Sequence, residues 1–361
     1  RIVNTSLFMT DWYIDQMKMK THKSDPIPSS FNREQYKGSK RDYSLYVERT
    51  QEPLLLDEML KFIALEDERA KITLDSGNKV NYFPSKKVFL PIDKNTIIKN
   101  KVVDPKFYDS IVPQIEFTIK DKALYKNRLM MLDIVNQNNW KRPIYFTGGS
   151  FGDDDYIWMK DYLQLDGMCF KLVPVKTPVK SPNPMEMGYI DSDKMFDIVM
   201  KWDWGNSESP AIYHDPETRK NSISYRTNLA RLAETLINEN KLGKAEKVID
   251  LAMEKMPLEY FGYYSFLEPF AKGYYAVGKK EKAKTMLTKL IKKQQENLAY
   301  YNTWKPSDQN FSAMDIMMDI EQYRSFLEIA KYGKDLEFYN KEKLKFNNYN
   351  KMFIRFGRKM E

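Results

Sequence analysis

The chain is poor in the residue types that most often carry metal and redox chemistry. Cys169 is its only cysteine, and His22 and His214 are its only histidines. A single cysteine excludes an intramolecular disulfide and a metal site built from cysteines. No run approaches about 18 consecutive apolar residues, so no membrane-spanning helix is expected within these residues. A basic-then-apolar leader is lacking as well, so no signal peptide is expected.

Neither sign of charge dominates the sequence. The 361 residues include 58 basic and 50 acidic side chains, which gives a net charge of +8. The lysines are dispersed and are densest at 279–293 and 331–345. A nucleic-acid-binding protein would show a concentrated basic stripe and a reader motif, so we expect no nucleic-acid partner. Weak attraction to an anionic membrane surface stays open as an alternative.

The sequence does contain an internal repeat. Residues 229–245 and 267–283 carry the same helical pattern at an offset of 38 positions, without a gap. The equivalent positions are apolar or small in both copies: Leu229, Leu232, Ala233, Leu236 and Ala245 correspond to Leu267, Phe270, Ala271, Tyr274 and Ala283. The pattern is similar to the tetratricopeptide repeat, although the usual period is about 34 residues. A pair of ordinary helical hairpins is the alternative interpretation.

The spacing within the first copy predicts two packed helices. Its first four apolar or small positions follow i, i+3, i+4, i+7, which is one face of a helix. Ala233 and Ala245 are small because the two helices are expected to touch there, and a larger side chain would push them apart. Pro257 is expected to end the second helix. Repeats bury their faces against neighbours, so we expect 310–332 to extend the stack and 334–361 to cap it.

The first half of the chain mixes strand and helix signals. Strands are expected at 1–8, 88–92, 114–119, 143–146 and 168–174, and helices at 12–20, 57–65, 127–138 and 153–163. This alternation is typical of an α/β layer with some parallel pairing. We therefore predict an α/β domain over 1–175, with a mixed, partly parallel sheet and flanking helices. A linker and bridging helix are predicted over 176–216, and an all-α tetratricopeptide-like domain over 217–361.

A glycine-rich turn at 147–155 (TGGSFGDDD) is the first candidate ligand site. It lies between an expected strand and an expected helix, where backbone N–H groups can bind phosphate. The turn lacks the glycine spacing of a dinucleotide site and the lysine of a P-loop, and its aspartates would repel phosphate. There are two alternatives to a phosphate site. The segment could be a tight turn that caps the helix with acidic side chains, or its carboxylates could hold a hard cation. The candidate ligand residues are Thr147, Gly148, Gly149, Asp153 and Asp154, joined by Trp12 and Asp15 at the start of the first helix, just past a strand end.

Other candidate residues have plainer interpretations. Trp202 and Trp204 (KWDWGN) could stack on a sugar ring, or they could pack at the domain junction. His214 and Asp215 are neighbours without a nucleophile motif, which favours a turn followed by a helix cap. Cys169 is expected to be a small core residue of a strand. Nothing in the sequence forms a catalytic constellation, so we assign no catalytic residue, no metal and no cofactor.

Three segments resemble one family of membrane proteins. They are RIVNTSLFMTDWYIDQMK at 1–18, WKRPIYFTGGSFGDDDYIWMKDYLQLDGMCFKLVP at 140–174, and KWDWGNSESPAIYHDPETRKNSISYRTNLARLAE at 201–234. The family is catalogued mainly as a domain of unknown function in Bacteroidetes-type bacteria. Its members combine a multi-pass membrane half, similar to protein O-mannosyltransferases of the GT-C class, with a soluble half that carries tetratricopeptide-like repeats. The resemblance covers essentially the whole chain.

This resemblance implies a location on the periplasmic face of the inner membrane, with Arg1 just after the last membrane helix. In GT-C enzymes the catalytic acid lies in a loop between early membrane helices, and this chain contains none of those positions. We therefore expect a non-catalytic interaction module that holds an acceptor protein or partner, or its own membrane domain, near the membrane. One rival is an α/β domain that binds or acts on a sugar or nucleotide near 147–155. The other is a purely structural or dimerisation domain.

Overall fold

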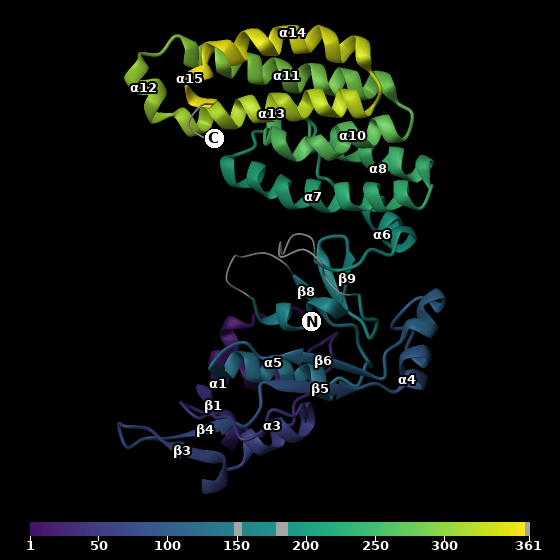
Figure 1. The fold of residues 1–361 in the computed structure, drawn as a ribbon. Helices are drawn as coiled ribbons and strands as arrows, with labels where there is room; N and C mark the ends of the chain where they lie inside the picture. The colour runs from purple at the N-terminus through teal and green to yellow at the C-terminus, as the bar shows by residue number, and fades with distance from the viewer. Residues whose placement is uncertain (148–153, 178–186, 358–361) are drawn as a thin grey trace. The chain divides into compact units, whose positions relative to one another are not determined.

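The computed structural model describes residues 1–147, 154–177 and 187–357, and the chain divides into two compact units (Figure 1). The N-terminal unit comprises Arg1–Leu165 and Cys169–Tyr189 and carries the sheets. The helical unit comprises Asp166–Met168 and Ile190–Glu361. Among the described residues, no helix has both the length and the apolar character needed to cross a membrane.

The N-terminal unit combines short strands with short helices. Its strands are β1 (Tyr43–Tyr46), β2 (Leu54–Leu55), β3 (Lys71–Thr73), β4 (Lys79–Phe83), β5 (Lys87–Pro91), β6 (Gln114–Thr118), β7 (Ala123–Tyr125), β8 (Tyr145–Thr147), β9 (Leu163–Asp166) and β10 (Cys169–Leu172). Its helices are α1 (Asp11–Lys18), α2 (Arg33–Tyr36), α3 (Leu56–Ala64), α4 (Lys94–Lys99) and α5 (Lys126–Gln137), with 3-10 helices η1 (Ser6–Met9), η2 (Glu68–Ala70), η3 (Pro105–Ser110) and η4 (Asp154–Tyr162).

The described strands form three small sheets. Their orders are β3-β4-β1-β7, β2-β5-β6 and β8-β10-β9. The pairs β1–β4 and β2–β5 are parallel, whereas β1–β7, β3–β4, β5–β6 and β8–β10 are antiparallel. The expected mixed sheet region with helices is therefore confirmed, although the strands are divided among several sheets.

Side-chain periodicity explains why these elements form. The α3 sequence places Leu56, Met59, Leu60 and Ile63 on one helical face, and all four are buried. In β6, buried Ile115 and Phe117 alternate with exposed residues, as a strand with one face on the core requires. In α5, the three residues expected to point inward are buried: Leu129, Leu132 and Val135.

The strand expected at 1–8 is wrong. Residues 6–9 form η1, and α1 follows after a single residue. The Asn4 side chain accepts a hydrogen bond from the Leu7 backbone N–H at 3.3 Å, and the Thr10 hydroxyl donates to the Leu7 carbonyl at 2.7 Å. Such local bonds give the backbone an alternative to strand pairing, and the resulting turn buries Phe8.

The helix expected at 153–163 is also only partly right. The described part is the 3-10 helix η4, which ends at Tyr162, and the chain then enters β9. The Leu165 N–H donates to the Tyr189 carbonyl at 2.8 Å, and the Tyr189 N–H donates to the Leu163 carbonyl at 3.0 Å. This pairing with a distant segment holds Leu163 and Leu165 extended and buried, and it overrides the local helical pattern.

The helical unit consists mainly of helices joined in pairs. They are α6 (Ser192–Val199), α7 (Pro216–Asn238), α8 (Leu242–Lys255), α9 (Leu258–Phe261), η6 (Tyr264–Leu267), α10 (Glu268–Ala276), α11 (Lys280–Asn302), α12 (Pro306–Phe311), α13 (Ala313–Tyr332), α14 (Leu336–Met352) and α15 (Ile354–Gly357). Short connections make hairpins of α7 with α8, α10 with α11 and α13 with α14, and neighbouring hairpins pack through α7 with α10 and α11 with α13 (Figure 1). The expected all-helical C-terminal region is confirmed.

The residues expected to pack the two sequence repeats are all buried: Leu232, Ala233, Leu236, Ala245, Phe270, Ala271, Tyr274 and Ala283. Helices also approach closely at Gly273 on α10, where an added Cβ would lie 2.7 Å from Cδ1 of Ile249 on α8. Pro269 lies in the first turn of α10, not in its interior, so it removes no bond within the helix.

The three hairpins close with the same turn. The middle residue of the connection between the two helices has a positive φ in each hairpin: 58° at Asn240, 77° at Gly278 and 55° at Lys334. The N–H of the next residue then donates to the carbonyl five positions back, in the pairs Lys241–Leu236, Lys279–Tyr274 and Asp335–Ala330. This arrangement satisfies carbonyls at the end of the first helix. The first two turns are 38 residues apart, the same offset as the sequence pattern.

Lys334 is expected to be the weakest of these turn residues. A side chain in the left-handed region costs about 1 kcal/mol, which glycine avoids. Lys334→Gly should therefore stabilise the helical unit by about 0.5–1 kcal/mol, whereas Gly278→Ala should destabilise it by a similar amount. Thermal unfolding followed by circular dichroism measures both changes. If Lys334→Gly leaves the melting temperature unchanged or lowers it, the backbone at Lys334 is not strained.

Candidate functional site

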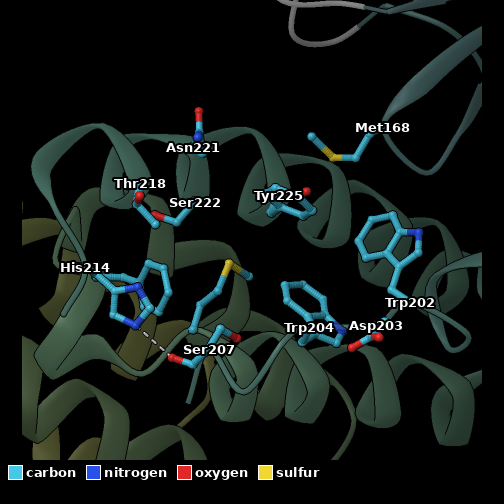
Figure 2. A pocket seen from close by; sticks show the side chains of 12 residues that line it. Met168, Trp202, Asp203, Trp204, Ser207, His214, Thr218, Asn221, Ser222 and Tyr225 are labelled. Carbon is cyan, nitrogen blue, oxygen red and sulfur yellow. Dashed lines mark hydrogen bonds between the residues drawn. The ribbon is translucent and has the colours of Figure 1, made fainter. Parts of the chain in front are cut away.

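The helical unit contains a hollow of about 380 Å³, which we call the aromatic pocket (Figure 2). Its lining residues come from α7, from the loop before α7, from the end of α8, from α9 and from the turn at Met168. They are Met168, Trp202, Asp203, Trp204, Ser207, His214, Thr218, Asn221, Ser222, Tyr225, Met256 and Phe261.

One face of α7 supplies the polar wall of this pocket. Thr218, Asn221, Ser222 and Tyr225 are spaced i, i+3, i+4, i+7 along this helix. Thr218, Ser222 and Tyr225 lie toward the other lining residues, whereas the exposed Asn221 amide points away from them at the edge of the hollow (Figure 2). Asp215 fixes where this helix begins, because its carboxylate accepts hydrogen bonds from the backbone N–H groups of the first turn at 2.9 and 3.1 Å. The predicted helix cap after His214 is thereby confirmed.

The loop after α6 supplies an aromatic wall. The ring centroids of Trp202 and Trp204 are 5.6 Å apart, and each indole lies 5.5 Å from the ring of Tyr225. Trp202 packs edge to face on Trp204 and on Tyr225, at interplanar angles of 65° and 86°, and the rings of Trp204 and Tyr225 are tilted by 51°. Asp203 lies between the two tryptophans in the sequence. Its carboxylate accepts a hydrogen bond from the Gly205 N–H at 3.0 Å, and Gly205 has a positive φ of 55° in this turn. The turn sends the chain back toward α7.

His214 forms part of the opposite end of the pocket. Its ring lies over Phe261 at 4.4 Å, and its Nε2 lies 2.9 Å from the Ser207 carbonyl oxygen. A carbonyl can only accept, so Nε2 carries the proton in this contact. Because Ser207 donates its hydroxyl to the Lys255 carbonyl, these two side chains do not form a nucleophile–base pair.

The pocket keeps polar groups available for a ligand. The hydroxyls of Thr218 and Ser222 donate to the Asp215 carboxylate and the Arg219 carbonyl, which leaves their oxygen lone pairs as acceptors. Within the described chain, the exposed Asn221 side chain makes no hydrogen bond, and the Asp203 carboxylate accepts only one. Asn221 offers both donors and an acceptor, and Asp203 offers acceptors.

A second hollow, of about 660 Å³, runs between α8, α9 and α11, and we call it the acidic groove. It is lined by Glu208, Met253, Glu254, Pro257, Leu258, Glu259, Tyr274, Glu281, Lys282, Thr285, Met286 and Lys289. These include four carboxylates and two ammonium groups around the apolar side chains of Met253, Leu258 and Met286.

Ion pairs leave the acidic groove with an excess of negative charge. Lys282 already pairs with Asp250 at 2.7 Å, and Lys289 pairs with Glu259 at 2.8 Å. Glu208 and Glu254 share one ammonium group, that of Lys255, at 2.8 and 2.9 Å. The hydrogen bond from Lys289 lowers the pKa of Glu259. Glu281 makes no ion pair within the described residues. A cationic ligand would therefore meet carboxylates that are not fully neutralised.

The structure places the predicted ligand residues of α1 in a different setting. Trp12 is 56% exposed and packs edge-to-face on Tyr13. Asp15 accepts hydrogen bonds from Arg33 at 2.9 Å and Tyr36 at 2.7 Å. Burial raises the pKa of Asp15, but these bonds outweigh burial and the pKa is lowered. The expectation of a ligand edge after a strand loses its basis, because no strand precedes α1.

The predicted glycine-rich ligand site is described only in part. Thr147 is the exposed last residue of β8 and pairs with Cys169 of β10, and Asp154 begins η4. Gly148, Gly149 and Asp153 lie outside the described residues. In the described chain, no hydrogen bond or ion pair links Thr147 to Trp12 or Asp15, so this site stays a prediction. No cluster of three or more metal-binding side chains occurs among the described residues.

Part of the aromatic pocket stands out in the sequence, but only as separate features. Trp202, Trp204 and His214 were each considered alone, and the fold brings them around one hollow. The α7 residues that complete it were missed. Their spacing gave no usable signal, because the first half of α7 is polar on most sides, with Glu217, Arg219 and Lys220 among them.

The comparisons with known proteins concern mainly the N-terminal unit. The profile of the TMEM260-associated domain 2 family matches residues 1–194, which is more than half of the 361 residues. No curated protein sequence and no solved structure gives a significant match to the chain. The chain therefore belongs to the TMEM260-associated domain 2 family.

Proposed function

We propose that this chain is a non-catalytic binding module of a membrane-bound, GT-C-like glycosyltransferase, and that its helical unit holds a polypeptide. In this proposal the module lies on the periplasmic face of the inner membrane. The membrane half of the same protein carries out any transfer reaction, and the polypeptide is an acceptor or a partner. The acidic groove is the observation that carries the proposal.

The hairpins support a tetratricopeptide-like stack. The sequence offset of 38 residues between the first two copies recurs in the positions of Asn240 and Gly278, which close equivalent turns. Small residues at equivalent positions let the helices of each pair approach. Stacks of this kind expose continuous surfaces that suit extended polypeptides.

The chemistry of the acidic groove specifies the segment that it would hold. Met253, Leu258 and Met286 offer apolar surface for apolar side chains. Around them, Glu281 offers a carboxylate to lysine or arginine side chains, and so does the exposed carboxylate of Glu254, which shares the ammonium group of Lys255 with Glu208. We therefore expect a segment in which apolar and basic residues alternate or lie close together, and we expect its binding to weaken at high salt.

Fluorescence anisotropy with labelled peptides of about 15 residues tests this proposal. A peptide of alternating leucine and lysine should bind, and the same peptide with glutamate in place of lysine should bind much more weakly. The double change Glu254→Lys with Glu281→Lys should weaken binding about tenfold, because each reversal turns attraction into repulsion worth about 0.5–1 kcal/mol at an exposed site.

Glu337→Lys, at an exposed position on α14, is the matched control and should leave the affinity unchanged. If the acidic peptide binds equally well, or the double variant binds the basic peptide like wild type, the groove is not the polypeptide site. Crosslinking to extracytoplasmic proteins, with wild type and the double variant side by side, then identifies the natural partner.

A further inference from the structure

We propose that the aromatic pocket is a binding site for an uncharged saccharide of one or two pyranose rings. The pocket and the acidic groove are separate hollows, so this inference does not depend on the proposed polypeptide site. It rests on the chemistry of the lining residues, on ring geometry and on volume.

The charge of the lining argues against phosphate-bearing ligands. The twelve lining residues include the carboxylate of Asp203 and neither lysine nor arginine. Nε2 of His214 is directed to the Ser207 carbonyl. A nucleotide, a sugar nucleotide or a phospholipid headgroup would bring negative charge to a site that offers it no cation.

The geometry of the rings argues against a cage for a quaternary ammonium group. Such a cage needs aromatic faces that surround the cation, each centred within about 6 Å of it. Here the ring centroids of Trp202, Trp204 and Tyr225 are only 5.5–5.6 Å from one another, and the rings meet edge to face or tilted. They pack as one wall, and no space for a cation remains between them.

The same features suit a saccharide. The C–H bonds on one face of a pyranose carry partial positive charge, which is attracted to the negative face of an aromatic ring. Thr218 and Ser222 of α7 then present hydroxyl lone pairs to the hollow, the exposed Asn221 amide stands at its edge, and the loop presents the Asp203 carboxylate. Asn221 and Asp203 match the donors and acceptors of sugar hydroxyls. A volume of about 380 Å³ lies within the range of small-molecule sites.

A peptide segment is the less favoured occupant. The polar groups described here belong to side chains on one helix face and one loop, and no open strand edge lines the pocket to pair with a peptide backbone. The hollow is compact, whereas an extended peptide needs a longer surface such as the acidic groove.

Saturation-transfer NMR and calorimetry with the whole chain test the proposal. The probes are maltose, cellobiose, lactose and mannobiose, titrated into the millimolar range, with UDP-glucose, acetylcholine and a proline-rich peptide as comparators. At least one disaccharide should bind, with transfer to ring C–H protons and a change in tryptophan fluorescence. Asn221→Ala should weaken that binding about five- to tenfold, because it removes the hydrogen bonds of one exposed side chain.

Two further variants keep the test decisive. Asp203→Asn retains the bond to Gly205 and should alter the choice among disaccharides, whereas Asn347→Ala, an equivalent truncation on the exposed surface of α14, should change nothing. The inference is overturned if none of the disaccharides binds, if Asn221→Ala and Asp203→Asn leave binding unchanged, or if the comparators bind more tightly. A failure here leaves the peptide titrations of the acidic groove unaffected, so the two proposals fail separately.

Discussion

An Arg226→Ala chain is expected to unfold its helical unit at a clearly lower denaturant concentration than the wild-type chain does. Arg226 lies in the middle of α7 and is completely buried. Its guanidinium donates to the Gly262 carbonyl at 2.5 Å and to the Met256 carbonyl at 2.9 Å, and it lies over the ring of Phe261. One side chain thus ties the first helix of the stack to the connection between the first two hairpins.

The expected loss is large because the buried Met256 carbonyl and the partly buried Gly262 carbonyl lose their donor together. An unsatisfied buried carbonyl costs about 1–3 kcal/mol, and the space left by the side chain adds a cavity term. We expect a total of about 3–5 kcal/mol, against a typical domain stability of 5–15 kcal/mol. Burial lowers the pKa of Arg226 to about 10, which leaves it charged at neutral pH.

Denaturant unfolding followed by circular dichroism, with hydrogen exchange to localise the change, measures this effect. Arg226→Lys should fall between wild type and Arg226→Ala, because one ammonium group reaches fewer acceptors than the forked guanidinium. Lys247→Ala, which removes a cationic side chain from the exposed face of α8, should change stability by less than about 0.5 kcal/mol. If Arg226→Ala lowers the free energy of unfolding no more than Lys247→Ala does, the buried guanidinium does not stabilise the helical unit.

Nothing in the sequence identified Arg226 as structural. A charged residue is usually exposed, and the repeat pattern names only the apolar and small positions around it. The carbonyls that Arg226 satisfies belong to residues 30 and 36 positions later. Such a bond exists only once α8 and the following turn are in place, so local propensity does not reveal it.

The sequence predicted the helical region well, because periodic burial there is a local property. The i, i+3, i+4, i+7 spacing of Leu229, Leu232, Ala233 and Leu236 is enough to define the buried face of α7. The strand expected at 1–8 failed for the opposite reason. Its apolar content looked extended, but two side-chain bonds to the Leu7 backbone make a turn, and single hydrogen bonds of this kind leave little trace in a hydrophobic pattern.

The aromatic pocket was predictable only in pieces. KWDWGN and the residues around His214 stood out by composition, but their proximity depends on how the loop returns to α7. The positive φ values of Gly205 and Asn206 set that return. The acidic groove was less predictable still, since its residues come from α8, α9, α10, α11 and the loop at Glu208 and share no motif. The position of residues on a surface assembled from several helices depends on tertiary packing, so the spacing of those residues in the sequence does not predict it.

In an Arg41→Ala chain, we expect the N-terminal unit to lose stability against unfolding. The helical unit should keep its protection against hydrogen exchange. Arg41 is 5% exposed, and its guanidinium donates hydrogen bonds to the carbonyls at the C-terminal end of α3. It donates to the carbonyls of Ile63 at 2.8 Å, Ala64 at 2.6 Å and Leu65 at 3.2 Å, and it also bonds to Glu66 at 3.0 Å. The last carbonyls of a helix have no partner within the helix, so this arginine supplies the donors that they need.

The loss should be about 2–4 kcal/mol, somewhat smaller than for Arg226. The Asn81 amide also donates to the Ile63 and Leu65 carbonyls, at 3.1 and 3.0 Å, so only part of the helix end loses its donors. Hydrogen exchange should show faster opening of α3 and β4, with α7 and α11 unchanged, and Arg41→Lys should recover part of the protection. Exposed Arg69, which pairs with nearby Asp67 on the surface, gives the control: Arg69→Ala should stay within about 0.5 kcal/mol of wild type. If Arg41→Ala instead loosens both units equally, their stabilities are coupled and each arginine supports more than its own unit.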